Sequence, residues 1–134
     1  MKLVEFYRYD EPGYQKLFNY NSWRLAILNY IDELDSKNIE YVEAHFLTDE
    51  AFILLEGRAI IYVLDEGKIK HFILNKNEVC NIKVGVYHTH VLSKDCKLLI
   101  IEEESTNYEN SKRIYLNEEQ KSKIVKVWEE YDKI

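Results

Sequence analysis

Short apolar runs separated by turn residues are the feature that most restricts how this chain can fold. Seven such runs follow one another, near residues 39–46, 51–55, 59–64, 69–74, 79–82, 87–92 and 97–102. Short strands at a spacing of about eight to twelve residues are typical of a β-sandwich or β-barrel, and they disfavour an alternating α/β sheet. The sequence therefore predicts an all-β fold.

The segments between these runs carry turn residues. Residues 56–58 and 65–68 each contain a glycine and predict tight hairpins, because glycine adopts positive φ at little cost. Residues 75–77 and 93–95 consist of Asn, Asp, Ser and Lys and predict looser hairpins.

The N-terminal part of the chain is expected to extend the β-structure. Residues 2–9 alternate in a way that suits a first strand, and Pro12-Gly13 predicts a turn before a second extended segment at 14–20. Residues 23–30 fit either a buried strand or a helix capped by Ser22. We favour the strand, because everything that follows is β.

The C-terminal part changes from β to helical character. Asn117 can cap a helix, with Gln120 as the reciprocal half of a capping box, and the helix is predicted over about 118–131. Its apolar residues fall on one face, so we expect it to pack on the outside of the β-structure. These residues are Ile124, Val127, Trp128 and Tyr131.

Length and composition restrict the class of protein. A chain of 134 residues predicts a single domain, 1–134. The net charge of -6 and the scattered Lys and Arg argue against nucleic acid as a partner. Because no run of about eighteen apolar residues occurs, we expect no membrane segment and a cytoplasmic protein. Cys80 and Cys96 fit neither a metal pair nor a disulfide framework, so we expect both to stay reduced.

Five ionisable side chains stand in two short segments of the apolar region. Glu43 and His45 are two residues apart on one expected strand and therefore project to the same side of the sheet. Glu50 opens the next strand, and His88 and His90 likewise share one face. In a closed β-structure one face of each strand points inward, so these side chains can converge on one cavity, as a metal or acid/base site requires.

Two ionisable residues nearby are expected to have other roles. His71 lies on the run between the two segments, and we expect it to be an ordinary surface or structural residue. Asp49 is expected to be a turn residue, although it would replace Glu50 if the strand register were shifted by one.

The same segments resemble the cupin superfamily, whose small jelly-roll barrels carry a first motif of Gly-x5-His-x-His-x3-4-Glu-x6-Gly. Glu50, six intervening residues and Gly57 match the end of this motif, and His45 stands at its second histidine. Glu43 replaces the first histidine, and Lys37 replaces the leading glycine.

A second cupin motif, Gly-x5-Pro-x-Gly-x2-His-x3-Asn, is matched in part. Gly85 and His88 stand at its second glycine and its histidine. The usual glycine, proline and asparagine are replaced by Asn77, Lys83 and Leu92.

The resemblance covers about residues 37–104 and implies a double-stranded β-helix, or jelly-roll barrel, with the C-terminal helix outside it. In cupins the two histidines, the glutamate and the second-motif histidine bind a divalent metal, often iron, manganese, nickel or zinc, and the resemblance implies no organic cofactor. Carried over by position, the implied ligands are Glu43, His45, Glu50 and His88.

His90 is implied to lie one step deeper on the same face. It would support the ligands, act as an acid or base near the metal, or serve as a ligand itself, and Glu43 and His90 are the candidate catalytic groups. Cupins commonly pair through sheets and swapped N-terminal strands, which implies a homodimer to which residues 2–9 contribute.

Two functions from different classes follow from this pattern. The first is a metal-dependent enzyme of isomerase, oxygenase or lyase type that acts on a small polar molecule, such as a sugar derivative or an organic acid. The alternative is a metal-free ligand-binding or sensor protein, indicated by the family positions that are missing here. A weaker possibility is an interaction subunit. No motif separates the reaction types.

Overall fold

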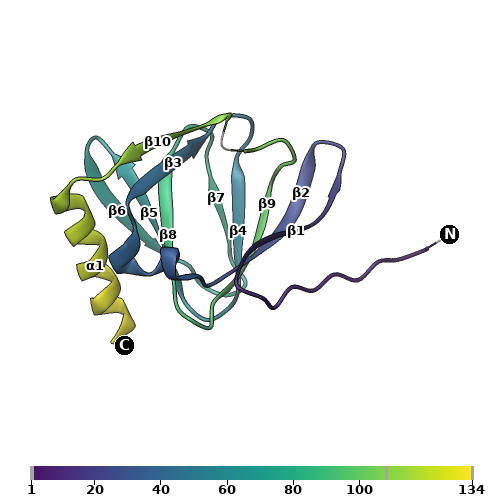
Figure 1. Ribbon diagram of the computed structural model, residues 1–134, viewed down its shortest axis with the longest axis horizontal. Helices are drawn as coiled ribbons and strands as arrows, with labels where there is room; N and C mark the ends of the chain where they lie inside the picture. The colour runs from purple at the N-terminus through teal and green to yellow at the C-terminus, as the bar shows by residue number, and fades with distance from the viewer. Residues whose placement is uncertain (1, 108, 134) are drawn as a thin grey trace.

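The computed structural model describes residues 2–107 and 109–133 as two five-stranded antiparallel sheets packed face to face, with one C-terminal helix (Figure 1). Sheet A has the strand order β1-β2-β9-β4-β7, and sheet B has the order β10-β3-β8-β5-β6. In chain order the elements are β1 (Gly13–Tyr20), β2 (Trp23–Asn29), the 3-10 turns η1 (Asp32–Leu34) and η2 (Ser36–Asn38), β3 (Tyr41–His45), β4 (Glu50–Glu56), β5 (Ala59–Asp65), β6 (Lys68–Ile73), β7 (Val79–Ile82), β8 (Tyr87–Leu92), β9 (Lys97–Glu103), β10 (Ser111–Tyr115) and α1 (Glu118–Asp132).

The chain crosses repeatedly between the two sheets, which is the arrangement of a jelly-roll barrel. The predicted fold class is thus confirmed, and so is the strand over residues 23–30. This segment forms β2, which lies between β1 and β9 in sheet A, with Ala26 and Leu28 buried against the core.

The predicted hairpins are confirmed in one case and wrong in three. β5 and β6 pair directly, and Glu66 and Gly67 both have positive φ, as a tight two-residue turn requires. The connections at 56–58, 75–77 and 93–95 instead join strands of different sheets. Turn residues predict that the chain reverses, but they do not determine which strand becomes its neighbour.

Gly57 shows why one of these crossings needs glycine. Its φ is +75°, and a Cβ at this position would lie 2.6 Å from the Cα of Cys96, in the neighbouring crossing connection. A side chain therefore fits neither the backbone conformation nor the available space.

The strand assignment differs from the prediction near each end of the chain. Residues 2–9 are not a strand in this structure, because they lie extended without a sheet partner, and a strand needs a neighbour to satisfy its backbone groups. β10 was not predicted, because its side chains are mostly exposed and its sequence is polar. It pairs with β3 and completes sheet B.

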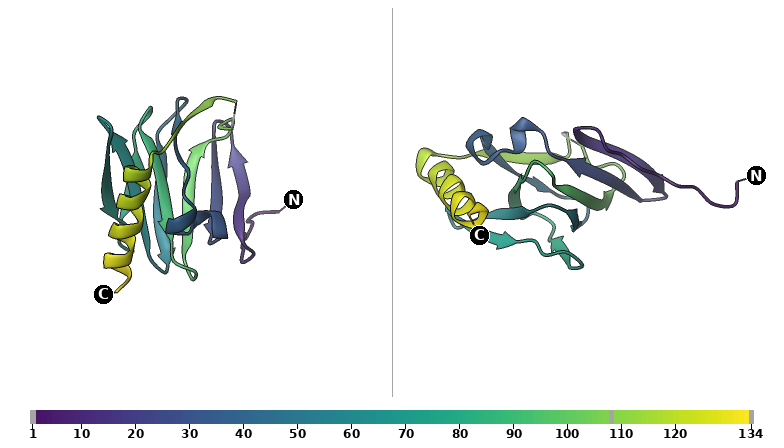
Figure 2. Two further views of the ribbon diagram at one scale, coloured as in Figure 1. Left: turned by 60° about the vertical axis from the view of Figure 1, so that its left-hand side comes forward. Right: turned by 90° about the horizontal axis from the view of Figure 1, so that it is seen from below.

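Two hydrophobic clusters hold the layers together. The first lies between the sheets and includes Ala26, Leu28, Phe52, Leu54, Ile61, Leu92, Leu98 and Ile100. The second lies between sheet B and α1, on the outer side of that sheet (Figure 2), and includes Ile39, Val42, Ile60, Tyr62, Val91, Leu116 and Ile124. The predicted helix, its capping box and its apolar face are therefore confirmed.

Two smaller expectations concern cysteines and membranes. Cys80 and Cys96 are both free, as expected. Among the described residues, no helix is long and apolar enough to cross a membrane.

Candidate metal centre

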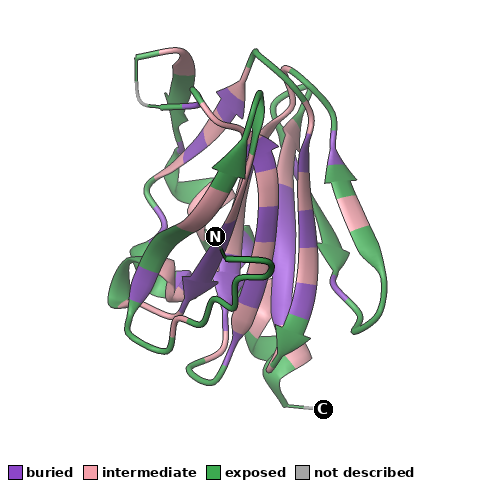
Figure 3. Cartoon of the chain, turned by 90° about the vertical axis from the view of Figure 1, so that its right-hand side faces the viewer, coloured by how far each residue is buried: buried purple, intermediate pink, exposed green. Residues whose placement is uncertain are grey.

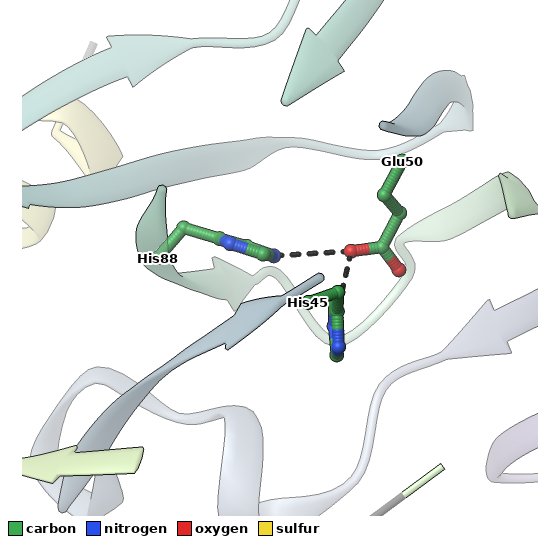
Figure 4. A group of neighbouring side chains, drawn as sticks. All are labelled: His45, Glu50 and His88. Atoms are coloured by element: carbon green, nitrogen blue, oxygen red, sulfur yellow. Dashed lines mark hydrogen bonds and ion pairs between the residues drawn. The ribbon is translucent and has the colours of Figure 1, made fainter. Parts of the chain in front are cut away.

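His45, Glu50 and His88 meet between the two sheets (Figure 4). His45 is the last residue of β3, Glu50 the first of β4, and His88 the second of β8, so three strand ends bring the side chains together. The Oε1 atom of Glu50 lies 3.4 Å from Nε2 of His45 and 3.1 Å from Nε2 of His88. One potential ligand atom from each residue lies within 4.8 Å of the others.

Hydrogen bonds on the far side of each imidazole determine which nitrogen faces Glu50 with a lone pair. The Ser111 hydroxyl donates its single proton to the carbonyl of Asn107 at 2.7 Å, so Nδ1–H of His45 donates to Ser111 Oγ at 2.8 Å. Nδ1–H of His88 donates to the carbonyl of Val86 at 3.0 Å. In their neutral forms both histidines therefore direct an Nε2 lone pair towards the carboxylate.

Burial and the short distances among the three residues shift the pKa of each one. Burial raises the pKa of Glu50 to about 7, and the nearby Glu102 adds to the rise while His88 opposes it. Burial lowers the pKa of His45, and the charge of His88 acts in the same direction. Burial would lower the pKa of His88 too, but its hydrogen bond to Glu50 and the Glu50 charge outweigh that effect and raise it.

Two lone pairs and a carboxylate that face one another need a cation between them. A proton shared between the Glu50 carboxylate and a histidine nitrogen satisfies this need, and so does a divalent metal ion. Two imidazole nitrogens and one carboxylate oxygen suit Fe(II), Mn(II) or Zn(II), and the backbone and hydroxyl acceptors behind the imidazoles orient them as metal-binding histidines are usually oriented. The residues present therefore fit a divalent metal.

Glu43, the fourth ligand implied by the resemblance, has another partner. It faces His88 across the β3–β8 pair, but its Oε2 atom accepts a hydrogen bond from Nε of Arg113 at 2.7 Å. Its other oxygen lies 3.8 Å from Nε2 of His45. The structure thus brings three of the four predicted ligands together and places Glu43 beside them, and its role as a ligand or catalytic group stays a prediction.

His90 lies deeper along β8, as predicted. Its ring centroid is 5.6 Å from that of Phe52, and its Nδ1 atom is buried without a hydrogen-bond partner among the described residues. Burial and the neighbouring histidines lower the pKa of His90 to about 3. The ring is therefore neutral near pH 7 and offers a hydrogen bond, not a charge.

A second carboxylate at the site was not predicted. Glu102 of β9 is buried, its charge contributes to the raised pKa of Glu50, and it accepts hydrogen bonds from Tyr14 Oη at 2.9 Å and Arg24 Nη2 at 2.6 Å. Burial alone would raise its pKa, but these hydrogen bonds and the Arg24 charge hold it below the usual range. The signal in the sequence was alternation, because Glu102 continues the inward face that Leu98 and Ile100 begin.

A cavity of about 340 Å³ opens onto the three residues. Arg113 stands among its lining residues, with its guanidinium carbon 4.1 Å from the ring centroid of Tyr41 and its Nε bound to Glu43. His45, Glu50, His88 and His90 line the same cavity. The space accommodates a small molecule that has both polar and apolar parts.

Asp49 and His71 have the roles expected for them. Asp49 accepts hydrogen bonds from Lys83 Nζ at 2.8 Å, Asn81 Nδ2 at 2.9 Å and the Val84 amide at 2.9 Å, which lower its pKa to about 2 and fix the turn. His71 is exposed on β6.

No family model and no curated protein sequence matches this chain. Solved structures do match. A cupin-2 domain containing protein from Shewanella frigidimarina is 24% identical, with a TM-score of 0.56 over 72% of this chain and 85% of that one. Protein NMB1881 from Neisseria meningitidis is 14% identical, with a TM-score of 0.54 over 71% and 89%.

The Fe(II) form of HppE also matches, at 17% identity and a TM-score of 0.54. The match covers 66% of this chain and 47% of HppE, so this chain spans about half the length of that one. These likenesses show the fold. The protein is a cupin-fold jelly roll with a His-Glu-His group that could hold a metal ion.

Proposed function

We propose that this protein binds a divalent metal through His45, Glu50 and His88 and acts on a small organic acid in the adjoining cavity. The single observation that carries the proposal is the convergence of two Nε2 lone pairs on one buried carboxylate, with the three ligand atoms within 4.8 Å. HppE, which has the same fold and has been solved with Fe(II), is consistent with a metal in this position.

Each residue has a distinct part in this proposal. A bound metal supplies a Lewis acid that polarises an oxygen of the ligand. At the cavity lining a carboxylate ligand would share the Arg113 guanidinium with Glu43, whose Oε2 lies 2.7 Å from Nε, and such a contact would favour an organic acid over a neutral sugar. His90 offers a neutral hydrogen-bonding group deeper in the cavity. Glu102 stays ionised beside Glu50, because its hydrogen bonds and the Arg24 charge keep its pKa low.

Elemental analysis of protein purified without an affinity tag or chelator tests the metal. The expected result is about one divalent ion per chain, which His45→Ala reduces to a small fraction. His71→Ala is the matched control, because His71 is exposed on β6 and far from the group in sequence. Protein without stoichiometric metal, in which added Fe(II), Mn(II) or Zn(II) causes no thermal stabilisation, would contradict the proposal.

A metal-free binding protein is the second candidate, and one observation favours it. Glu50 with its pKa of about 7, and His88 with its raised pKa, can satisfy the same contacts with protons alone. Thermal-shift measurements with small carboxylic acids, with and without EDTA, separate the two functions. Stabilisation that survives EDTA supports the second candidate, and stabilisation that needs metal supports the first.

A further inference from the structure

The inward face of β3 is less buried than that of β9 on the other side of the cavity. In β9 the inward residues are buried and those between them are half-buried, which produces alternating bands on the strands of sheet A in Figure 3. β3 has the reverse pattern. Val42 and Ala44, which face away from the cavity, are fully buried. The three residues that line the cavity, Tyr41, Glu43 and His45, are only half-buried. The cavity is therefore open along β3.

Sheet B opens between β3 and β8. Among the described residues these strands pair at a single position, Glu43 opposite His88, whereas β5 and β8 pair at six positions. Thr89, the next residue of β8, pairs with Tyr62 of β5, whose side chain packs under α1 on the outer side of sheet B. Residues directly opposite each other point to the same side of a sheet, so Thr89 is on the outer side as well. It nevertheless lines the inner cavity, because the sheet is open at this point.

A second cavity, of about 340 Å³, lies at this opening, and we call it the side cavity. Three residues line both the side cavity and the cavity at the candidate metal centre, namely Leu34, Tyr41 and Thr89. The other lining residues come from η1, η2, the segment before β3 and the end of β10, and they are Glu33, Asn38, Ile39, Glu40 and Tyr115. The two cavities therefore adjoin.

Two tyrosine rings form a wall of the side cavity. Tyr41 and Tyr115 meet edge to face, with ring centroids 5.7 Å apart and ring planes at 82°. The Arg113 guanidinium lies over the Tyr41 ring, with its carbon 4.1 Å from the centroid, whereas Tyr115 is 70% exposed. The side chains of Leu34 and Ile39 complete the apolar part of the lining. Such a lining suits an uncharged aromatic ring, which gains edge or face contacts with Tyr115 in addition to leaving water.

The charged groups of the side cavity argue against a second acid group on the ligand. Glu33 and Glu40 are the lining carboxylates, and Lys121 Nζ lies 2.7 Å from Glu40. Lys121 balances the charge of Glu40, and the carboxylate of Glu33 would repel an anion. Glu33 is exposed, so water and salt screen its charge and it gives an ammonium group little attraction.

We propose that the ligand of the metal centre is an aryl-substituted organic acid, whose carboxylate lies at the metal and whose ring lies in the side cavity against Tyr115. This inference rests on the proposed function, because it takes the metal centre as the site of the acid group. His45 lies four residues after Tyr41 on β3, a distance of about 13 Å in an extended strand. The acid and the ring must therefore be joined by a chain of several bonds that passes between β3 and β8.

Isothermal titration calorimetry on the zinc-loaded full chain tests the proposal with two pairs of acids. ω-Phenylhexanoate should bind at least about tenfold more tightly than hexanoate, because its ring reaches the side cavity and leaves water there. Phenylacetate should show no such gain over acetate, because its ring is too close to the carboxylate to reach the side cavity.

Variants of Tyr115 locate the ring. Tyr115→Ala should reduce the gain of phenylhexanoate over hexanoate to less than about threefold, and Tyr115→Phe, which keeps the ring, should retain the gain. Tyr20→Ala is the matched control, because Tyr20 is 65% exposed on β1 of the other sheet, and the gain should be that of the wild type. Circular dichroism establishes that each variant is folded. Nuclear Overhauser contacts from the bound phenyl protons to the Leu34 methyl groups are expected in the wild type and need no variant.

The outcomes separate this inference from the proposed function. Metal-dependent binding of hexanoate without a gain from the phenyl ring would overturn the inference and leave the proposed function standing. A gain that Tyr115→Ala does not reduce, or a bound phenyl ring without Overhauser contacts to Leu34, would overturn the inference in the same way. Absence of binding by every acid, with and without zinc, would overturn the proposed function and the inference together.

Discussion

The ion pair between Arg24 and Glu102 gives the sharpest prediction about stability. Arg24 Nη2 lies 2.6 Å from Glu102 Oε1, and the two side chains are only 16% and 6% exposed. Arg24 also donates hydrogen bonds to the carbonyls of Glu104 at 2.8 Å and Thr106 at 2.9 Å, at the lip of the cavity. Replacing Arg24 by methionine keeps much of the side-chain volume but leaves Glu102 as a buried carboxylate without its cation.

Removing one partner of a buried ion pair typically costs about 3 to 5 kcal/mol. For a chain of 134 residues, each kcal/mol lowers Tm by about 3 to 4 °C, so Arg24→Met should lower Tm by about 10 °C or more. Lys70→Met is the matched control, because Lys70 and Asp65 are also 2.6 Å apart but 57% and 51% exposed. Its cost should stay below about 1 kcal/mol.

The pH dependence of the stability loss in Arg24→Met distinguishes the loss of the ion pair from the loss of side-chain packing. The folded-state pKa of Glu102 lies below its unfolded value, so its stabilising contribution is present above the unfolded pKa and is lost as pH falls through the folded one. Arg24→Met removes much of this contribution, so the difference in unfolding free energy between wild type and variant should be largest near pH 7 and shrink below about pH 4. Denaturant titrations at several pH values measure it. A loss below about 1 kcal/mol, or one that is the same at every pH, would refute the reasoning.

Four further outcomes are expected. Gly57→Ala should prevent correct folding or cost several kcal/mol by denaturant unfolding, because its Cβ would lie 2.6 Å from the Cys96 Cα at a φ of +75°. Tyr62→Phe removes the 3.1 Å hydrogen bond from the buried hydroxyl to a carbonyl of α1 and should cost about 1 kcal/mol in thermal unfolding. Asn117→Ala removes the helix cap and should cost about 1 kcal/mol, with faster amide exchange in the first turn of α1. Because Glu50 has a pKa of about 7, the affinity for Zn(II) measured by calorimetry should fall by about tenfold per pH unit below pH 7.

The parts of the fold that the sequence predicted are those determined by residues close together in the chain. Alternation and apolar run length located the strands, and the capping box from Asn117 to Gln120 located the start of α1. These signals are carried by neighbouring residues. Whether the chain continues in the same sheet or crosses to the other is decided by contacts far apart in sequence, such as Gly57 against Cys96, and a turn signal does not contain them.

Some residues of the candidate site could likewise be predicted from the sequence, and others could not. His45, Glu50 and His88 could be found because they are unusual residues at motif spacing. Glu102 was missed because it looks like the polar end of a strand, and Arg24 because its partner is 78 residues away in the chain. Their pairing follows only from the register of β2 against β9, which sets Arg24 opposite Glu102. A carboxylate at the end of an apolar inward face is the signal that would have revealed it.

The buried carboxylates of Glu50 and Glu102 have different partners, and this difference decides which of them can bind a metal. Glu102 is committed to Arg24 and Tyr14, so its charge is already balanced and it is not free to bind a metal. Glu50 faces His45 and His88 and has no such cation of its own. The proposed ligand set is therefore three side chains. Structural zinc sites usually have four protein ligands, whereas catalytic sites keep positions open for water or substrate. A three-residue set beside a cavity of about 340 Å³ has the ligand number of the second kind, and a metal held there would remain accessible to a ligand in the cavity.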